Sequence, residues 1–130
     1  MGNYNSSLIL QKMVFDEIKF ERKGFKNSLS EFEMKLNVQI GVSKDNVYKV
    51  TLTLFGEKKE EYDIVIRLSG FFELEGHEEI DNEVMQDLIN KNTVAIMMPY
   101  LRSELTLLTS QPDTESVVLP PLNINKMLKK

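Results

Sequence analysis

The chain has 130 residues, a formal net charge of −4 and no cysteine. This length supports a single domain, residues 1–130, with a substantial core. The absence of cysteine excludes disulfides, thiolate metal ligands and cysteine nucleophiles, and the negative charge argues against nucleic acid as the main partner. The longest apolar run, residues 94–98, is far shorter than the ~20 residues of a membrane-spanning helix. We therefore expect no stable membrane insertion and a cytoplasmic location.

The start of the chain, residues 1–7, is polar, and we expect it to be disordered and to carry no secretory signal. Gly2 followed by Ser6 matches the myristoylation pattern. That pattern is short and no polybasic cluster lies beside it, so it does not by itself indicate a lipid anchor.

Residues 8–22 show the imperfect alternation of a long strand with two partly apolar faces. The alternation places Leu8, Leu10, Val14, Ile18 and Phe20 on one face and Ile9, Met13 and Phe15 on the other. Part of the second face must therefore contact something other than water.

Residues 32–42 have the cleanest pattern in the chain, with apolar and polar residues alternating throughout, which is typical of a half-buried antiparallel strand. Short turns lead to two more strands, from Tyr48 to Leu54 and from Tyr62 to Leu74. An isolated glycine in a strand indicates a bulge or bend, so Gly70 predicts that the last part leaves the sheet plane. Together these segments predict a four-stranded antiparallel sheet whose first connection passes around an edge.

The periodicity becomes helical after Asp81, a plausible N-cap, and the polar run 90–92 is a possible interruption. Residues 93–110 predict a long helix kinked at Pro99. A short, truncated C-terminal helix is expected over 125–130. Strands followed by helices indicate an α+β domain with the helices on one side of the sheet.

The stretch from Asn92 to Ile124 is more apolar than one small sheet can cover. Either other subunits cover this apolar surface, or the protein performs its function through it. We expect the oligomer interface along one helical stripe, formed by Val94, Met97, Leu101, Leu105 and Leu108.

Five segments match, in order, the pattern of one known family. Residues 11–21 resemble its opening strand, and 48–50 and 70–72 resemble its third strand and the exit of its fourth. Residues 98–104 (MPYLRSE) resemble its Phe-Pro-Tyr-x-Arg-Glu helix, and 119–124 (LPPLNI) its Pro-x-Leu-Asn-Leu segment. The chain thus resembles SecB, the bacterial protein-export chaperone family, over most of its length.

The resemblance implies an ATP-independent holdase that binds unfolded or extended polypeptides, such as preproteins, in apolar grooves and keeps them competent for export. It implies no cofactor, metal or catalytic residue, and a homotetramer built as a dimer of dimers, or a homodimer. SecA-like docking is expected at Glu17 and Glu21. The residues expected to bind peptide are Phe71, Phe72, Leu74, Met98, Tyr100, Val118, Leu119, Leu122 and Ile124.

Two departures from the family pattern concern SecA. The terminal helix and acidic tail are reduced to residues 125–130, which carry a basic cluster at Lys126, Lys129 and Lys130. Near Val65 an apolar residue stands where the family has an acidic one. The alternative hypothesis is therefore a SecB-like module dedicated to one partner, for example in a toxin–antitoxin system, without SecA coupling.

Two hypotheses outside chaperone function also stay open. The same fold can serve as an interaction module, buried against one partner or against itself. An enzymatic function would require His77, the one histidine, to act as a base or metal ligand. It lies in the sequence among Glu75, Glu78, Glu79 and Asp81. A single imidazole without a fixed second ligand is a weak signal, and a solvated acidic turn before a helix explains it better. We therefore predict no enzymatic activity and no metal site.

Overall fold

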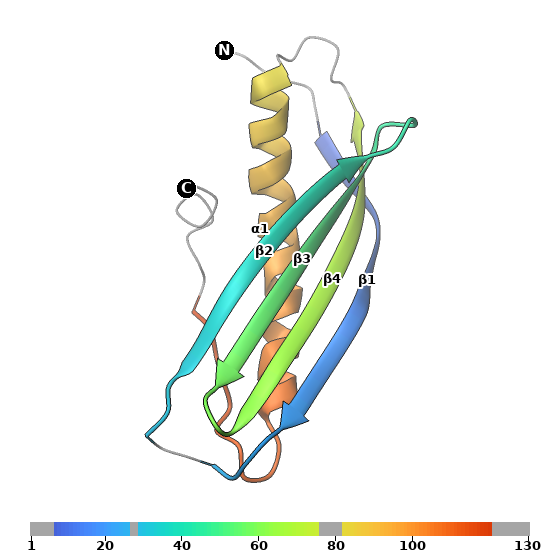
Figure 1. Ribbon diagram of the computed structural model, residues 1–130. Coiled ribbons are helices and arrows are strands. Elements are labelled where there is room, and N and C mark those ends of the chain that lie inside the picture. The colour runs from blue at the N-terminus through green and yellow to red at the C-terminus, as the bar shows by residue number, and fades with distance from the viewer. Residues whose placement is uncertain (1–6, 27–28, 76–81, 121–130) are drawn as a thin grey trace.

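The computed structural model describes residues 7–26, 29–75 and 82–120, which form one antiparallel sheet with one long helix on its inner face (Figure 1). The elements, in chain order, are β1 (Ser7–Arg22), β2 (Phe32–Val42), β3 (Val47–Lys58), β4 (Tyr62–Glu75) and α1 (Asn82–Thr109). The strand order is β1-β4-β3-β2, so β1 and β2 are the edges. The predicted α+β fold is confirmed.

The first connection carries the chain from one edge of the sheet to the other, past the β3–β4 turn. The backbone N–H groups of Lys23 and Gly24 donate to the carbonyl of Glu61, at 2.8 and 3.1 Å. A Cβ at residue 24 would lie 2.4 Å from the carbonyl oxygen of Glu60, so this close approach requires glycine. Ser30 Oγ donates to the carbonyl of Lys59 at 3.0 Å. The connection is thus fixed to the turn at both ends.

Two register shifts in β1, between Leu10 and Lys12 and between Phe15 and Glu17, correct the predicted faces of this strand. Each shift inserts one extra residue, and one residue reverses the side on which the following side chains lie. Val14 therefore lies on the outer face. The inner, helix-facing row is Leu8, Leu10, Met13, Phe15, Ile18 and Phe20.

Gly70 does not bend β4 away from the sheet, contrary to the prediction. β4 stays paired along its length, and Gly70 faces Val50 on one side and Met13 on the other. A Cβ at this position would lie 2.9 Å from the Phe72 ring and 3.0 Å from the Met97 sulfur. Glycine is needed here because the helix packs closely against the strand.

The helix is continuous over 28 residues, through both 90–92 and Pro99. A proline in a helix interior leaves the carbonyl four residues earlier without its partner. Here that residue is Ala95, which is exposed, so water can satisfy its carbonyl. The predicted interruption is wrong. The predicted N-cap at Asp81, residues 1–6 and the C-terminal helix lie outside the described residues.

The core lies between α1 and the two middle strands. All inner residues of β3 and β4 are buried, from Tyr48 to Lys58 and from Tyr62 to Leu74. Neighbouring strands lie about 4.8 Å apart and a helix is about 10 Å wide, so one helix cannot cover four strands. The inner rows of β1 and β2 are consequently buried in part, and mainly beside the helix. Within the described residues, no helix is long and apolar enough to cross a membrane.

Candidate functional site

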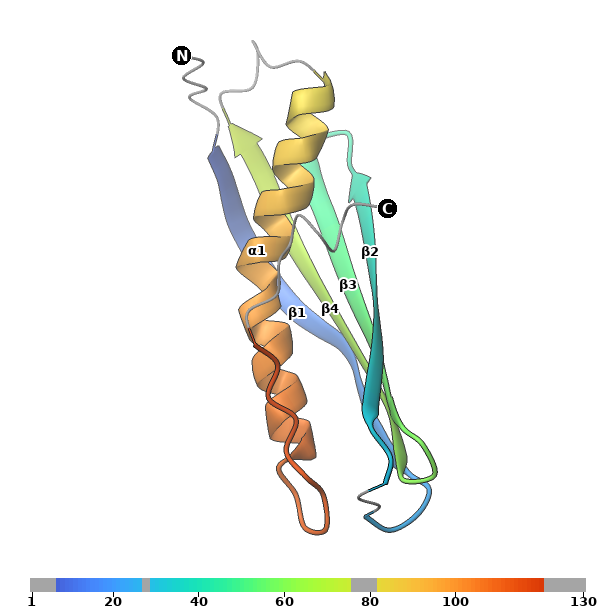
Figure 2. The same ribbon diagram turned by 90° about the vertical axis from the view of Figure 1, so that its left-hand side faces the viewer.

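The chain after the helix turns back along it on the β2 side (Figure 2). We call residues 110–120 the return segment. Thr106 Oγ1 donates to the carbonyl of Val117 at 2.8 Å, the Val117 N–H donates to Thr109 Oγ1 at 2.8 Å, and Arg102 Nε donates to the carbonyl of Leu119 at 3.2 Å. These bonds hold the return segment in an extended form against α1.

Side chains along the return segment point alternately toward the core and toward solvent. Val117 and Leu119 pack against the core, while Val118 is 73% exposed. The segment thus forms a wall of the inner layer beside β2. Of the predicted peptide-binding residues here, Val118 and Leu119 stay candidates, and Leu122 and Ile124 lie outside the described residues.

The inner face of β2 carries a row of apolar side chains that remain partly exposed. We call it the β2 strip; it consists of Phe32, Met34, Leu36, Val38 and Ile40. In the described sheet β2 pairs with β3 alone, so its other edge presents backbone N–H and C=O groups. The strip therefore offers apolar side chains next to backbone hydrogen-bonding groups. Sequence analysis missed it because alternation predicts an apolar face without showing whether that face is covered.

β1, at the opposite edge, exposes apolar side chains on both of its faces. Leu10 and Ile18 are exposed on the inner face, and Ile9 and Val14 on the outer face. The outer edge of β1 has no strand partner among the described residues. This edge therefore presents apolar side chains and backbone groups together.

The predicted oligomer stripe is the face of the helix that packs on the sheet. Val94, Met97, Leu101 and Leu105 are fully buried within the single chain, and Leu108 is partly buried. The expectation is corrected because this stripe already covers β3 and β4. The exposed apolar residues of α1 lie on the opposite face, which we call the helix stripe: Ile96, Tyr100, which is 53% exposed, and Leu107, which is 68% exposed.

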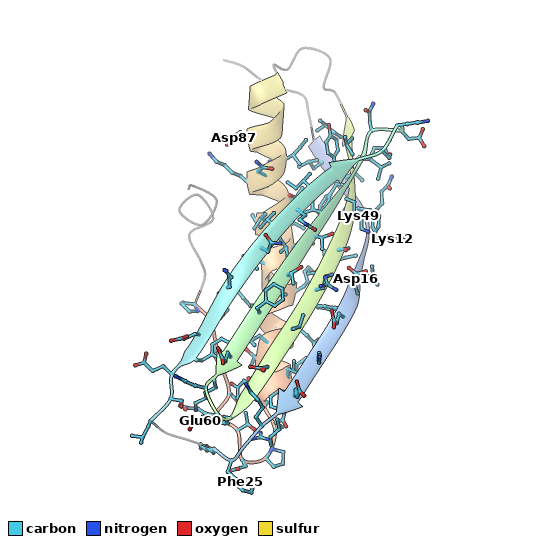
Figure 3. The ribbon with its side chains drawn as sticks, viewed as in Figure 1. Lys12, Asp16, Phe25, Lys49, Glu60 and Asp87 are labelled. Atoms are coloured by element: carbon cyan, nitrogen blue, oxygen red, sulfur yellow. The ribbon has the colours of Figure 1, made fainter. Side chains whose placement is uncertain are left out.

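The predicted peptide-binding residues of β4 and α1 fall into two groups, one buried in the core and one on the surface. Phe72, Leu74 and Met98 are core residues, so in this chain they are not accessible to a peptide. Phe71 lies on the outer face because neighbouring strand residues point to opposite sides. Its ring lies between the ammonium groups of Lys12 and Lys49, at 5.0 and 5.7 Å, on the outer face shown in Figure 3. Tyr100 is exposed and stays a candidate.

The outer face carries a row of carboxylates across all four strands. Pairing brings Glu21, Asp63, Glu57 and Glu33 into this row. Like charges directly opposite one another destabilise a sheet. Lys23 relieves part of this repulsion through an ion pair with Asp63 at 3.1 Å. The hydrogen bond to Asp63, with smaller contributions from Glu57 and Glu21, raises the pKa of the Lys23 ammonium.

A shallow pocket of about 510 Å³ lies over this row of carboxylates and over the neighbouring row of outer-face residues. Its apolar floor is formed by Phe55 and Val65, with Lys19 and Lys35 on either side. Of the two predicted docking residues, Glu21 lines this pocket. Glu17 instead forms an ion pair with Arg67 at 2.7 Å. The outer face therefore presents an apolar centre beside a line of negative charge.

Most of the cluster around the one histidine, from which no enzymatic activity was predicted, lies outside the described residues. His77, Glu78, Glu79 and Asp81 lie outside the described residues, and Glu75 is the last residue of β4. Among the residues that are described, no group of three or more His, Cys, Asp or Glu side chains is placed to hold a metal ion.

Comparison with known proteins agrees with this architecture. The family model described as "Preprotein translocase subunit SecB" matches residues 3–130. The Protein-export protein SecB of Alcanivorax borkumensis is 24% identical over 133 residues, which cover 93% of this chain and 83% of that protein. The uncharacterized protein MJ0357 of Methanocaldococcus jannaschii is 36% identical over 77 residues, 56% of this chain. That match spans 48% of MJ0357, about half its length.

A solved structure has the same fold. It is the Mycobacterium tuberculosis Rv1957 SecB-like chaperone, in complex with a ChAD peptide from the Rv1956 HigA1 antitoxin. The TM-score is 0.76 at 8% identity, and the match covers 89% of this chain and 91% of Rv1957. The family model spans nearly the whole sequence, and the fold agrees with that of a SecB-like protein. The chain belongs to the SecB family.

Proposed function

We propose that this protein is an ATP-independent holdase of the cytoplasm that binds extended segments of unfolded polypeptides on the β2 strip and keeps them competent for export. The observation that carries the proposal is the partly exposed inner face of β2. Partly exposed apolar side chains alternate there over nine residues, beside a free strand edge and an extended wall. An extended client can place every second side chain on this strip and pair its backbone with the strand edge.

Weak, repeated contacts suit a chaperone that must also release its client. Burial of apolar surface contributes roughly 25 cal/mol per Å², so each partly exposed side chain of the strip adds at most about 1 kcal/mol. Several such contacts together give useful affinity without strong sequence selection. Met34 fits this role because methionine repacks around different partners. Release then needs no nucleotide hydrolysis, because each contact breaks separately.

The proposed assembly uses the two remaining apolar surfaces. A second copy pairing along the β1 edge would cover Leu10 and Ile18 and protect an unpaired edge, which natural proteins seldom leave open. The helix stripe would join two such dimers into a dimer of dimers. This arrangement leaves the β2 strip of every copy open.

The outer-face pocket is the proposed docking surface for SecA or for another dedicated partner. Glu21 and the rest of the carboxylate row favour a basic partner. Glu17 is engaged by Arg67, and Val65 puts an apolar residue at the centre of the pocket, so a partner other than SecA is the second candidate. Binding of purified SecA, compared with binding of several unrelated unfolded proteins, separates the two.

The test of the function is suppression of aggregation of a slow-folding protein, compared between the natural chain and two variants. Leu36→Asn alters the β2 strip, and Lys35→Asn, its exposed neighbour on the outer face, is the matched control. We expect Leu36→Asn to lower suppression about fivefold while Lys35→Asn changes little. No suppression by the natural chain, or equal loss in both variants, would contradict the proposal. Thermal unfolding of both variants shows that each is folded.

A further inference from the structure

A pocket of about 320 Å³ with polar and aromatic walls lies beneath the return segment, and we call it the base pocket. It lies at one end of the β2 strip, because Phe32 belongs to both. Its walls come from the first connection, three strands and the return segment: Ser30, Glu31, Phe32, Lys58, Tyr62, Glu115, Ser116 and Val117.

The charges around the base pocket are unbalanced. The ammonium of Lys58, which is buried, lies 3.4 Å from Glu61 Oε1 and 3.8 Å from Glu115 Oε1. Glu31 adds a third carboxylate at the rim. Arg22 also acts on Tyr62 in the pocket wall, so two cations stand against three carboxylates. One negative charge remains in excess, so the pocket attracts cations and repels anions.

One hydroxyl of the base pocket lacks a hydrogen bond. Tyr62 is fully buried, and its Oη has no hydrogen-bond partner among the residues that the structure describes. Buried polar groups are nearly always paired, so an unpaired hydroxyl in a pocket wall indicates a place for a polar ligand atom. Burial, with the nearby Glu61 and Glu115 carboxylates, raises the pKa of Tyr62 to about 12. The hydroxyl therefore stays protonated and can accept a hydrogen bond at neutral pH.

Phe32 gives the pocket a flat apolar wall. Its ring lies across Gly56, where a Cβ would be 2.7 Å from the ring carbon Cζ. The ring centroid is 6.4 Å from that of Tyr62. Since any side chain at residue 56 would displace the ring, the glycine sets the position of this wall. A planar group can stack on such a ring.

We propose that the base pocket binds the guanidinium group of an arginine side chain in the client polypeptide. This inference rests on the proposed function. A guanidinium is planar, permanently charged and rich in donors, so it can stack on Phe32 and donate to Glu31 and Glu115. Tyr62 Oη is buried, so contact with it requires the pocket to open further. The client preferred by this chain is then an apolar-alternating segment with an arginine near one end.

The test measures binding of labelled ten-residue peptides to the full chain by fluorescence anisotropy. Each peptide has leucine at alternate positions and carries arginine, citrulline or lysine near its N-terminus or its C-terminus. Citrulline keeps the shape of arginine without its charge. We expect one of the two arginine peptides to bind about tenfold more tightly than its citrulline counterpart.

Two variants show whether the base pocket causes that preference. Glu31→Gln with Glu115→Gln removes the two rim charges and should reduce the arginine advantage to less than about twofold. Glu33→Gln with Glu57→Gln removes two charges from the outer face and should leave the advantage unchanged. Tyr62→Phe removes the unpaired hydroxyl, and it should lower the advantage about threefold while the protein stays folded.

Equal binding of arginine and citrulline peptides, or an advantage that survives Glu31→Gln with Glu115→Gln, would overturn the inference. Lysine peptides that bind as tightly as arginine peptides would overturn the assignment to a guanidinium. The proposed function fails separately, and takes this inference with it, when none of the peptides binds.

Discussion

The two edges of the sheet differ in what lies next to them. β2 has the return segment beside it, and its apolar residues on the inner face are partly exposed, while its outer residues are polar. β1 exposes apolar side chains on both faces, Leu10 and Ile18 inside and Ile9 and Val14 outside, while its other exposed residues are polar or charged. An edge with one apolar face suits a ligand that lies in the inner layer. An edge with two apolar faces suits continuation of the sheet by another strand.

The two strands also differ in regularity, because β1 contains two bulges and β2 contains none. They bring Met13 and Phe15 to the inner face beside Leu10 and Ile18, and they move Val14 outward. The shifts thereby gather most of the apolar side chains of β1 on the inner face and leave Ile9 and Val14 on the outer face. β2 pairs without a register shift, so its alternation remains strict and its apolar residues stay on one side.

Both edges depend on the helix staying over the middle strands, and the largest predicted effect concerns that packing. Leu101→Ala removes a fully buried side chain from α1 and should lower the free energy of unfolding by about 3–5 kcal/mol. Urea denaturation measures the change. A variant that keeps full stability but loses mass in light scattering would show that Leu101 lies at a subunit contact instead of in the core.

Ile18→Lys is the next test, because Ile18 is 45% exposed on the inner face of β1. A lysine there would bring two like charges together in the β1–β1 contact and should weaken dimerisation by about 100-fold or more. Light scattering at several concentrations would then give the monomer mass. Leu107→Lys, on the helix stripe, should instead stop assembly at dimers. Identical masses for the two variants would contradict the assignment of separate surfaces.

A pH dependence should arise on the β2 side from Tyr62. Its pKa is raised to about 12 in the folded chain, mainly by burial, from about 10 in the unfolded chain. The neutral phenol is favoured in the folded state, so its contribution is complete below pH 10 and is lost as the pH rises toward 12. The loss should amount to about 2 kcal/mol. Urea denaturation between pH 8 and pH 11 should show this decline in the natural chain and a smaller one in Tyr62→Phe.

The smallest effect is expected for the exposed ion pair on the outer face of β1. Glu17→Gln breaks the contact with Arg67, and partly exposed pairs of this kind contribute roughly 0.2–1 kcal/mol. The decrease should shrink further in high salt, because mobile ions screen surface charges. A change above about 2 kcal/mol would mean that Glu17 holds β1 to β4 and is not a surface residue.

Alternation and family resemblance predicted the fold from the sequence. The sequence predicts that the first connection passes around an edge of the sheet, but it does not specify that β1 pairs with β4. The bulges in β1 were not predictable, since an extra residue leaves no mark other than imperfect alternation. Gly70 was misread because a glycine that admits a helix and a glycine that bends a strand look the same in a sequence.

Prediction of the candidate site was less successful, for one physical reason. Sequence identifies apolar side chains, but exposure depends on which partner covers them. Leu101 and Phe72 were taken for contact residues because they are apolar and lie in the right segments, and both are core. Alternation predicts a half-buried strand over residues 32–42, but it does not show that Leu36 and Val38 stay partly exposed because a single helix cannot reach β2.

Site-specific crosslinking tests the difference between the edges most directly, because the chain has no native cysteine. Val38→Cys on the β2 strip, Gln39→Cys on the outer face of the same strand and Ile18→Cys on β1 would each carry a photoactivatable crosslinker. With an unfolded client present, residue 38 should crosslink to the client, residue 18 to a second copy of the chain, and residue 39 to neither. Client crosslinks of equal yield at residues 38 and 39, or at residue 18, would contradict the account.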